Sequence, residues 1–293
     1  MNVHTSDRAF MAAHGRLLDR RRLEFLLDEA DPDAVLAALD GYRNPDGGYG
    51  WGLEPDLRAP ESQPAAAMHA LEVLAEIGPA TSPRSLEVCD WLEAHSLPDG
   101  GVPFALTVAD PAGCAPVWLD PDTTTSSLQM TAQVAANAHL VARHDPAVRS
   151  HPWLARATEW CLSAVRELRT TPHAHELLFA IRFLDVVADA EPDALTALDR
   201  LGRVLPADGI VAVQGGAEGE VLRPLDFAPH AEGPARHLFS DDVINRELHR
   251  LAADQQSDGG WTVDFTSASP AASLEWRGYA TVQAVRRLRG HDL

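Results

Sequence analysis

Two pairs of acidic residues stand two positions apart in this sequence, each in a loop that follows a glycine-rich turn. Asp120 and Asp122 belong to the run Asp-Pro-Asp-Thr-Thr, and Glu54 and Asp56 belong to the run Glu-Pro-Asp. Two carboxylates that share a site repel each other, and this repulsion raises the pKa of one of them. Such a pair could supply a general acid, which alkene protonation and glycoside hydrolysis both require.

The same residues also have a purely structural interpretation. Asp-Pro-Asp-Thr-Thr is ordinary chemistry for the start of a helix, because side-chain oxygens there accept bonds from the first free backbone N–H groups. The helix N-terminus favours the anion by only about 0.3–1 kcal/mol, so close carboxylate coupling with burial would dominate in a buried loop. For both pairs the catalytic and the structural interpretations stay open.

Aromatic and basic side chains near the turns and loops are candidates for substrate binding. A desolvated ring can stabilise a carbocation by up to roughly 2 kcal/mol, and an aromatic face can also stack on a sugar. The aromatic candidates are Tyr49, Trp51, Phe104, Trp118, Trp261, Trp276 and Tyr279. Three arginines could bind a diphosphate, namely Arg58, Arg223 and Arg277.

Several of these residues have simpler explanations. Trp51 and Trp261 each follow a Gly-Gly pair, where packing that stabilises a repeat is common. Glu275 and Arg277 are consistent with a buried ion pair that ties the last helix to its neighbours. His173 and His175 are two residues apart at a helix start and do not share a face, which argues against a metal site.

A repeated unit of helix, Asp-Gly-Gly turn, loop and helix positions the candidates. The turns at 46–48, 99–101 and 258–260 contain glycines that can take positive φ. Short strands are expected only at 210–213 and 261–265. Helices are expected at 7–29, 32–42, 63–77, 85–95, 126–141, 151–168, 174–189, 193–204, 240–254 and 273–289.

Self-similarity over tens of residues indicates a stacked or closed array of helix pairs. In each pair the second helix has the longer Ala-rich apolar stretch, which suits an inner ring surrounded by an outer one. We therefore predict an all-α protein, a single closed α/α toroid of about five to six helix pairs that forms one domain over residues 1–293.

The amino-acid composition argues against several classes of binding partner. The net charge is −19 and the chain contains no Lys, so we expect no nucleic-acid binding and no attachment to anionic lipid. Cys89, Cys114 and Cys161 form no Cys-x-x-Cys pair, which argues against a disulfide framework and a zinc site. The N-terminus lacks the apolar core of a signal peptide, and no long apolar run occurs. A cytoplasmic protein without integral membrane association is expected.

The run Gln255-x-x-Asp258-Gly259-Gly260-Trp261 resembles the Gln/Trp repeat of squalene–hopene cyclases and related terpenoid cyclases. That superfamily, which includes the protein prenyltransferase β subunits, consists of α/α toroids with a cavity at the barrel mouth. Asp120-Pro-Asp122-Thr-Thr resembles the Asp-x-Asp-Asp acid motif of class II terpene cyclases, in the Asp-x-Asp-Thr-Thr form of drimenyl-type cyclases.

This resemblance implies an enzyme, a class II-like terpene cyclase that cyclises a small apolar isoprenoid by protonation. Asp122 would be the general acid and Asp120 its partner. No cofactor is implied, although a diphosphate substrate would allow Mg²⁺ to assist, and no protein metal site is predicted. The fourth position of the commoner motif is Thr123, and 293 residues leave no room for the second helical domain that closes such cavities. An oligomer could close the cavity instead.

Two other functions fit the same sequence. One is a non-catalytic toroid that binds an isoprenoid or a protein. The other is a carbohydrate-active α/α barrel that uses paired carboxylates. An enclosed aromatic-lined cavity reaching Asp122 would favour the cyclase, whereas an open polar groove beside paired carboxylates would favour a glycosidase. The loop Glu54-Pro-Asp56 and the run Glu275-Trp276-Arg277-Gly-Tyr279 also resemble bacterial toroid proteins without a known activity.

Overall fold

The structure is a computed structural model that describes residues 3–79, 82–168 and 171–289. Thirteen α-helices account for most of these residues. Strand structure within the described part is one small antiparallel sheet, in which β1 (Val211–Ala212) pairs with β2 (Val221–Leu222). The expected all-α fold class is confirmed. None of the described helices combines the length and apolar composition needed to cross a bilayer.

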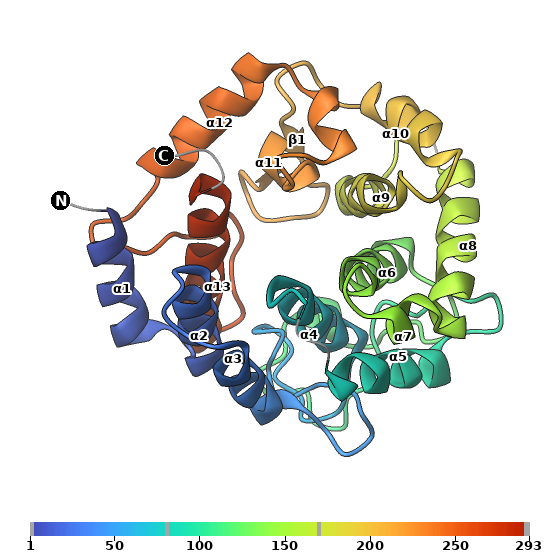
Figure 1. Cartoon of the computed structure of the whole chain (residues 1–293), viewed down its shortest axis with the longest axis horizontal. Helices are drawn as coiled ribbons and strands as arrows, with labels where there is room; N and C mark the ends of the chain where they lie inside the picture. Colours follow the sequence, from blue (N-terminus) through green and yellow to red (C-terminus); the bar gives the residue numbers. More distant parts are fainter. Residues whose placement is uncertain (1–2, 80–81, 169–170, 290–293) are drawn as a thin grey trace.

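The helices lie in two layers around a central space (Figure 1). The helices that surround this space are α4 (Pro64–Glu76), α6 (Leu128–Ala142), α9 (Ala174–Val187), the short α11 (Pro224–Phe227) and α13 (Pro270–Arg289). Outside them lie α1 (Val3–His14), α3 (Pro32–Leu39), α5 (Pro83–His95), α8 (Pro152–Glu167), α10 (Ala194–Gly202) and α12 (Asp241–Ala253). The remaining helices are α2 (Leu17–Leu26), which packs against α3 and α13, and the short α7 (Pro146–Arg149).

Small side chains let the inner helices approach one another closely. Helices α4, α6 and α9 pack side by side, and the faces that α4 and α6 bury are rich in alanine. The buried alanines of α4 and α6 are Ala65, Ala66, Ala67, Ala70, Ala132, Ala135, Ala136, Ala138 and Ala142. Alanine favours helix and leaves no bulk to separate neighbouring backbones. The Ala-rich helices α4 and α6 therefore lie inside, as the sequence pattern predicts, whereas the inner helix α9 buries mainly Leu, Ile, Phe and Val side chains.

The Asp-Gly-Gly turns join successive units by a repeated set of hydrogen bonds. Asp46 Oδ1 accepts the Gly48 N–H (3.0 Å) and the Ser62 hydroxyl (2.8 Å), and its Oδ2 accepts the Trp91 indole N–H (3.0 Å). The next unit repeats these contacts around Asp99, with Gly101, Ser126 and Trp160. We call these hydrogen bonds from a Ser and a Trp side chain to the turn aspartate the Asp–Ser–Trp clamp. A Cβ on Gly48 would lie 2.6 Å from the Ser62 side chain, so only glycine fits beneath the clamp.

The last turn packs against the first helix. Gly259 has φ +94°, and a Cβ there would lie 2.0 Å from the Ser6 carbonyl oxygen in α1. Helix α13 also contacts α1 and α2, so the two ends of the described chain are neighbours. Trp261 is buried and donates its indole N–H to the Leu251 carbonyl (2.7 Å), which is the packing role expected of this position.

Two predicted elements differ from the structure. The single helix expected at 7–29 is divided into α1 and α2, because the chain leaves the helix at Gly15 and Arg16 takes extended backbone angles. The strand expected at 261–265 is irregular, and the partner of β1 is instead the segment Val221–Leu222.

Candidate functional site

Asp122 lies in solvent. Its carboxylate accepts the backbone N–H (2.8 Å) and the hydroxyl (2.6 Å) of Thr124. These bonds, together with those from Thr125, lower the pKa of Asp122 to about 2. Asp120 is also exposed and has φ +52°. The expectation of a buried, uncharged acid at Asp122 is therefore wrong, because the side chain is ionised and stabilises its own turn.

Most of the predicted aromatic residues serve local packing. Tyr49 is fully buried, which raises the pKa of its phenol, and Trp51 is 58% exposed with its indole bonded to Asn44. Phe104 stacks on the buried Trp118 with ring centroids 4.9 Å apart.

The three predicted anion-binding arginines are each next to a carboxylate of the protein. Their partners are Glu275 for Arg58 (2.7 Å), Glu247 and Asp264 for Arg223 (3.7 Å each), and Asp258 for Arg277 (2.7 Å). Their charges are thus balanced within the chain. The expected pair between Glu275 and Arg277 is replaced by two pairs with other segments.

The second acidic pair lies in a different environment. Glu54 and Asp56 are only 5% and 7% exposed, and the Asp56 N–H donates to the Glu54 carboxylate (3.3 Å). Asp56 also accepts the Trp276 indole N–H (2.7 Å) and the Ala268 N–H (2.8 Å). The structure thus joins the Glu54–Asp56 loop to the start of α13, two segments that the sequence analysis singled out separately.

A buried histidine connects this loop to α4. His69 Nε2 lies 2.9 Å from Glu54 Oε2, and its Nδ1 lies 3.4 Å from Glu72 Oε2. Burial alone would lower the pKa of His69, but the hydrogen bonds to the two carboxylates raise it to about 9. At neutral pH the ring is therefore an imidazolium that donates to both neighbours.

Helix α13 completes this cluster. The Tyr279 hydroxyl donates to Glu72 Oε1 (3.0 Å), and the rings of Trp276 and Tyr279 lie 6.0 and 5.4 Å from that of His69. Arg22 forms a bidentate pair with Glu76 (2.7 and 2.8 Å) and lies 3.5 Å from Glu72. Burial would raise the pKa of Glu72, but Arg22 and then His69 hold it below its ordinary value. We call His69, Glu54, Glu72, Glu76 and Arg22 the acidic cluster.

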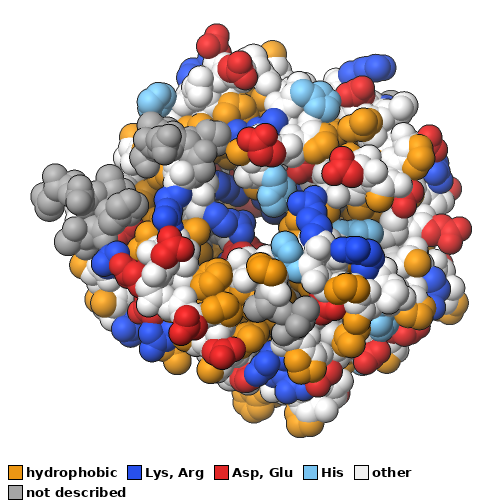
Figure 2. Space-filling view, in the orientation of Figure 1, with side chains coloured by type: hydrophobic (Ala, Val, Ile, Leu, Met, Phe, Trp, Pro, Cys, Tyr) orange, Lys and Arg blue, Asp and Glu red, His pale blue; other side chains and the backbone are white. Residues whose placement is uncertain are grey.

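The accessible faces of the inner helices are mainly polar. Their outer sides are packed on the outer layer, so the partly exposed side chains on the opposite side face the central hollow that Figure 2 shows. On α6 these side chains follow a helical stripe of Gln129, Gln133 and Asn137. Other helices contribute Met68, Glu72, His175, Phe179, Arg182, Trp276, Tyr279 and Arg286.

Arginine and histidine side chains gather around this hollow (Figure 2). Arg182 in α9 lies within electrostatic reach of Arg287, Glu72 and Tyr279, which places it across the hollow from the acidic cluster. His230 lies near Arg286, Arg182, Arg143 and Arg287. Sequence analysis did not select these residues, and α9 also contains His175, Glu176 and Asp185, so no local pattern distinguishes Arg182. We call Arg182, Arg286, Arg287 and His230 the arginine cluster.

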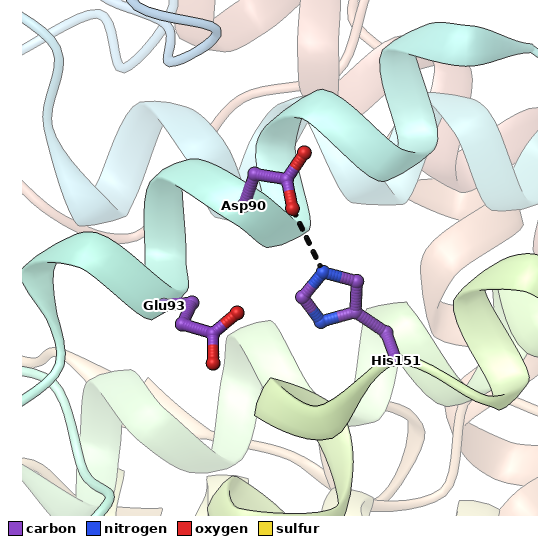
Figure 3. Close-up of side chains that lie close together, drawn as sticks. All are labelled: Asp90, Glu93 and His151. Carbon is purple, nitrogen blue, oxygen red and sulfur yellow. Dashed lines mark hydrogen bonds and ion pairs between the residues drawn. The ribbon is translucent and has the colours of Figure 1, made fainter.

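A third group, Asp90, Glu93 and His151, has metal-ligand chemistry (Figure 3). Its potential ligand atoms lie within 4.8 Å of one another. However, His151 Nδ1 accepts the Trp153 N–H (3.2 Å) and caps α8, so Nε2 carries the proton and donates to Asp90 (3.0 Å). Glu93 pairs with Arg156. A helix cap and an ion pair account for this group without a metal.

Comparison with known proteins gives information on the fold. No protein-family model matches the chain, and no curated protein matches it. A crystal structure of a protein from Actinoplanes is similar to this chain, with a TM-score of 0.57, 16% sequence identity and all of both chains covered. At this identity the likeness concerns the fold alone.

Proposed function

We propose that residues 1–293 form one closed α/α toroid of the terpenoid-cyclase type. The contacts of α13 with α1 and α2 support closure, as does the last Asp-Gly-Gly turn seated on α1. The repeated Asp–Ser–Trp clamp supports the helix-pair repeat on which the resemblance depends. Closure would give the inner helices a common hollow, which is the natural place for a ligand.

Within this ring we propose that the central hollow binds a small hydroxylated molecule of the carbohydrate class. The polar stripe of Gln129, Gln133 and Asn137 carries the proposal, because amide side chains offer both donors and acceptors to hydroxyl groups. Trp276, partly exposed on α13, offers an aromatic face on which a sugar ring could stack.

Proton-initiated cyclisation fits these surroundings less well. A carbocation needs a dry, aromatic surface and an acid that is protonated at rest. The accessible faces of α4, α6, α9 and α13 carry amide, carboxylate and guanidinium groups beside the aromatic rings of Phe179, Trp276 and Tyr279, and Asp122 is ionised. We therefore favour ligand binding over cyclisation of an isoprenoid, and the Asp122 acid is kept as a hypothesis that the same experiment tests.

Calorimetric titration of the full chain with a panel of mono- and disaccharides tests the proposal. We expect saturable binding that weakens at least about fivefold in Gln133→Leu, since a lost hydrogen bond that leaves a polar ligand group unpaired costs about 1–3 kcal/mol. Gln256→Leu, at an exposed turn outside the ring, is the matched control and should bind normally.

Incubation with farnesyl diphosphate is the second arm. A cyclic product from the wild type that disappears in Asp122→Ala would establish the cyclase and overturn our proposal. Failure of every saccharide to bind, or equal binding by wild type and Gln133→Leu, would also overturn it.

A further inference from the structure

The arginine cluster contains more positive charge than the protein neutralises. Arg182 donates its Nε–H to the backbone carbonyl of Asp226 (2.6 Å), and its guanidinium lies 5.5 Å from the centroid of the Phe179 ring. Across residues 3–79, 82–168 and 171–289, no carboxylate forms an ion pair with Arg182. Asp226 and Glu72 attract the guanidinium at longer range. Among the described residues its terminal nitrogens have no hydrogen-bond acceptor, so they can donate to an anion in the hollow.

The neighbouring cations are only partly balanced. Arg287 lies 3.3 Å from the Asp226 carboxylate, and its Nε is buried without an acceptor. Arg286 shares Glu76 with Arg22, which also lies within 3.5 Å of Asp19 and Glu72. Because the whole chain has a net charge of −19, an unneutralised group of arginines is a specific local arrangement and does not follow from composition.

The titration of this cluster agrees with its geometry. Burial and then the repulsion of Arg287 lower the pKa of Arg182. The pKa of His230 is lowered to about 4 by burial and by the positive charges of Arg286, Arg182, Arg143 and Arg287. The ring is therefore neutral at pH 7. Arg236 also contacts the segment, since its Nε donates to the His230 carbonyl (3.2 Å). A bound anion would relieve this repulsion.

We infer that Arg182, Arg287 and His230 form a site for the phosphate group of a phosphorylated ligand. The inference rests on the proposed hollow-binding function and specifies the ligand further, as a sugar-phosphate-like molecule whose hydroxyl groups meet the α6 amides. Phosphate suits the site because its several oxygens can accept from two guanidinium groups and an imidazole at once. Binding of the dianion would also favour protonation of His230.

Titration with inorganic phosphate and with pyrophosphate tests the site apart from any sugar. We expect both anions to bind the wild type, and Arg182→Gln to weaken their binding at least about tenfold, because it removes a charged hydrogen-bond donor. Arg182→Lys should recover part of the affinity. Arg246→Gln, on the exposed side of α12, removes the same charge elsewhere and should leave binding unchanged.

A spectroscopic measurement separates a binding role from a structural one. In NMR titrations, saturating phosphate should raise the pKa of His230, whereas a histidine that only packs would not respond. Equal affinity of wild type and Arg182→Gln, or an unchanged His230 titration, would overturn the inference. If Arg182→Gln does not fold, Arg287→Gln and the His230 titration decide the matter.

The two proposals fail in different ways. Neutral saccharides that bind through Gln133 while phosphate does not bind would leave the proposed function intact and refute the phosphate site. Phosphate that binds through Arg182 while no saccharide binds would do the reverse.

Discussion

His69 and His230 lie in two regions of the molecule whose charges are arranged oppositely. The pKa of His69 is raised to about 9 because the carboxylates of Glu54 and Glu72 outweigh burial. The pKa of His230 is lowered to about 4 because burial and the surrounding arginines act together. The first histidine lies among three carboxylates and pairs with two of them, whereas the second is kept neutral by burial among arginines.

The two charge arrangements indicate a structural role for the acidic cluster and a binding role for the arginine cluster. Each charged group of the acidic cluster pairs with another group of the protein. The cluster therefore needs no ligand to explain it, and it links α2, α4 and α13. Arg182 in the arginine cluster has no carboxylate partner among the described residues. Charges that a protein balances internally stabilise its fold, whereas buried charges without a partner are costly and point to a ligand.

The largest expected effect is the loss of stability when the acidic cluster is disrupted. Arg22→Met leaves Glu72, Glu76 and Asp19 without their buried cation, and breaking such a pair costs about 3–5 kcal/mol. Urea denaturation should show this loss. Arg21→Met, which removes an exposed arginine one position earlier, is the control and should change stability by less than about 1 kcal/mol. Similar values for both variants would show that the acidic cluster does not hold the ring together.

A pH effect should follow from His69. Its pKa is higher in the folded protein (about 9) than its ordinary value of 6.5, so the stabilisation is complete below pH 6.5 and is lost as pH rises through 9. The shift corresponds to about 3 kcal/mol. In His69→Gln the free energy of unfolding should change much less between pH 6.5 and 9. A wild-type stability that rises over this interval would contradict the charged state assigned to His69.

The arginine cluster should behave in the opposite way to the acidic cluster. Arg182→Gln removes one hydrogen bond from a charged donor, worth about 1.5–3 kcal/mol, but also relieves repulsion from Arg287, so we expect a loss of stability below about 2 kcal/mol. Urea denaturation without phosphate checks this. A loss as large as that of Arg22→Met would show that Arg182 is structural.

The smallest expected effect is at the acidic loop before α6. Asp122→Ala removes an exposed side chain that bonds only within its own turn, so the melting temperature and ligand binding should be unchanged within error. Thermal denaturation and calorimetry are the measurements. A marked loss of ligand binding would show that Asp122 takes part in the function.

The sequence predicts the repeat better than the site. Ala-rich stretches and Asp-Gly-Gly turns are local signals, so the helix pairs and the turn at Gly259 could be predicted directly. The contact between Asp56 and Trp276 joins residues 220 positions apart, and no local pattern encodes such a pairing. The 3.6-residue period of a helix identifies the side chains that share a face with Arg182. It does not identify the residues on the opposite side of the hollow. Motif spacing alone could not show that Asp122 is exposed.

The most direct test of the central claim is calorimetric titration of three variants with a panel of sugar phosphates. The ligand site proposed here lies in the hollow, so Gln133→Leu and Arg182→Gln should each weaken binding while Asp122→Ala binds as the wild type does. Loss of binding in Asp122→Ala with normal binding in the other two variants would contradict the account.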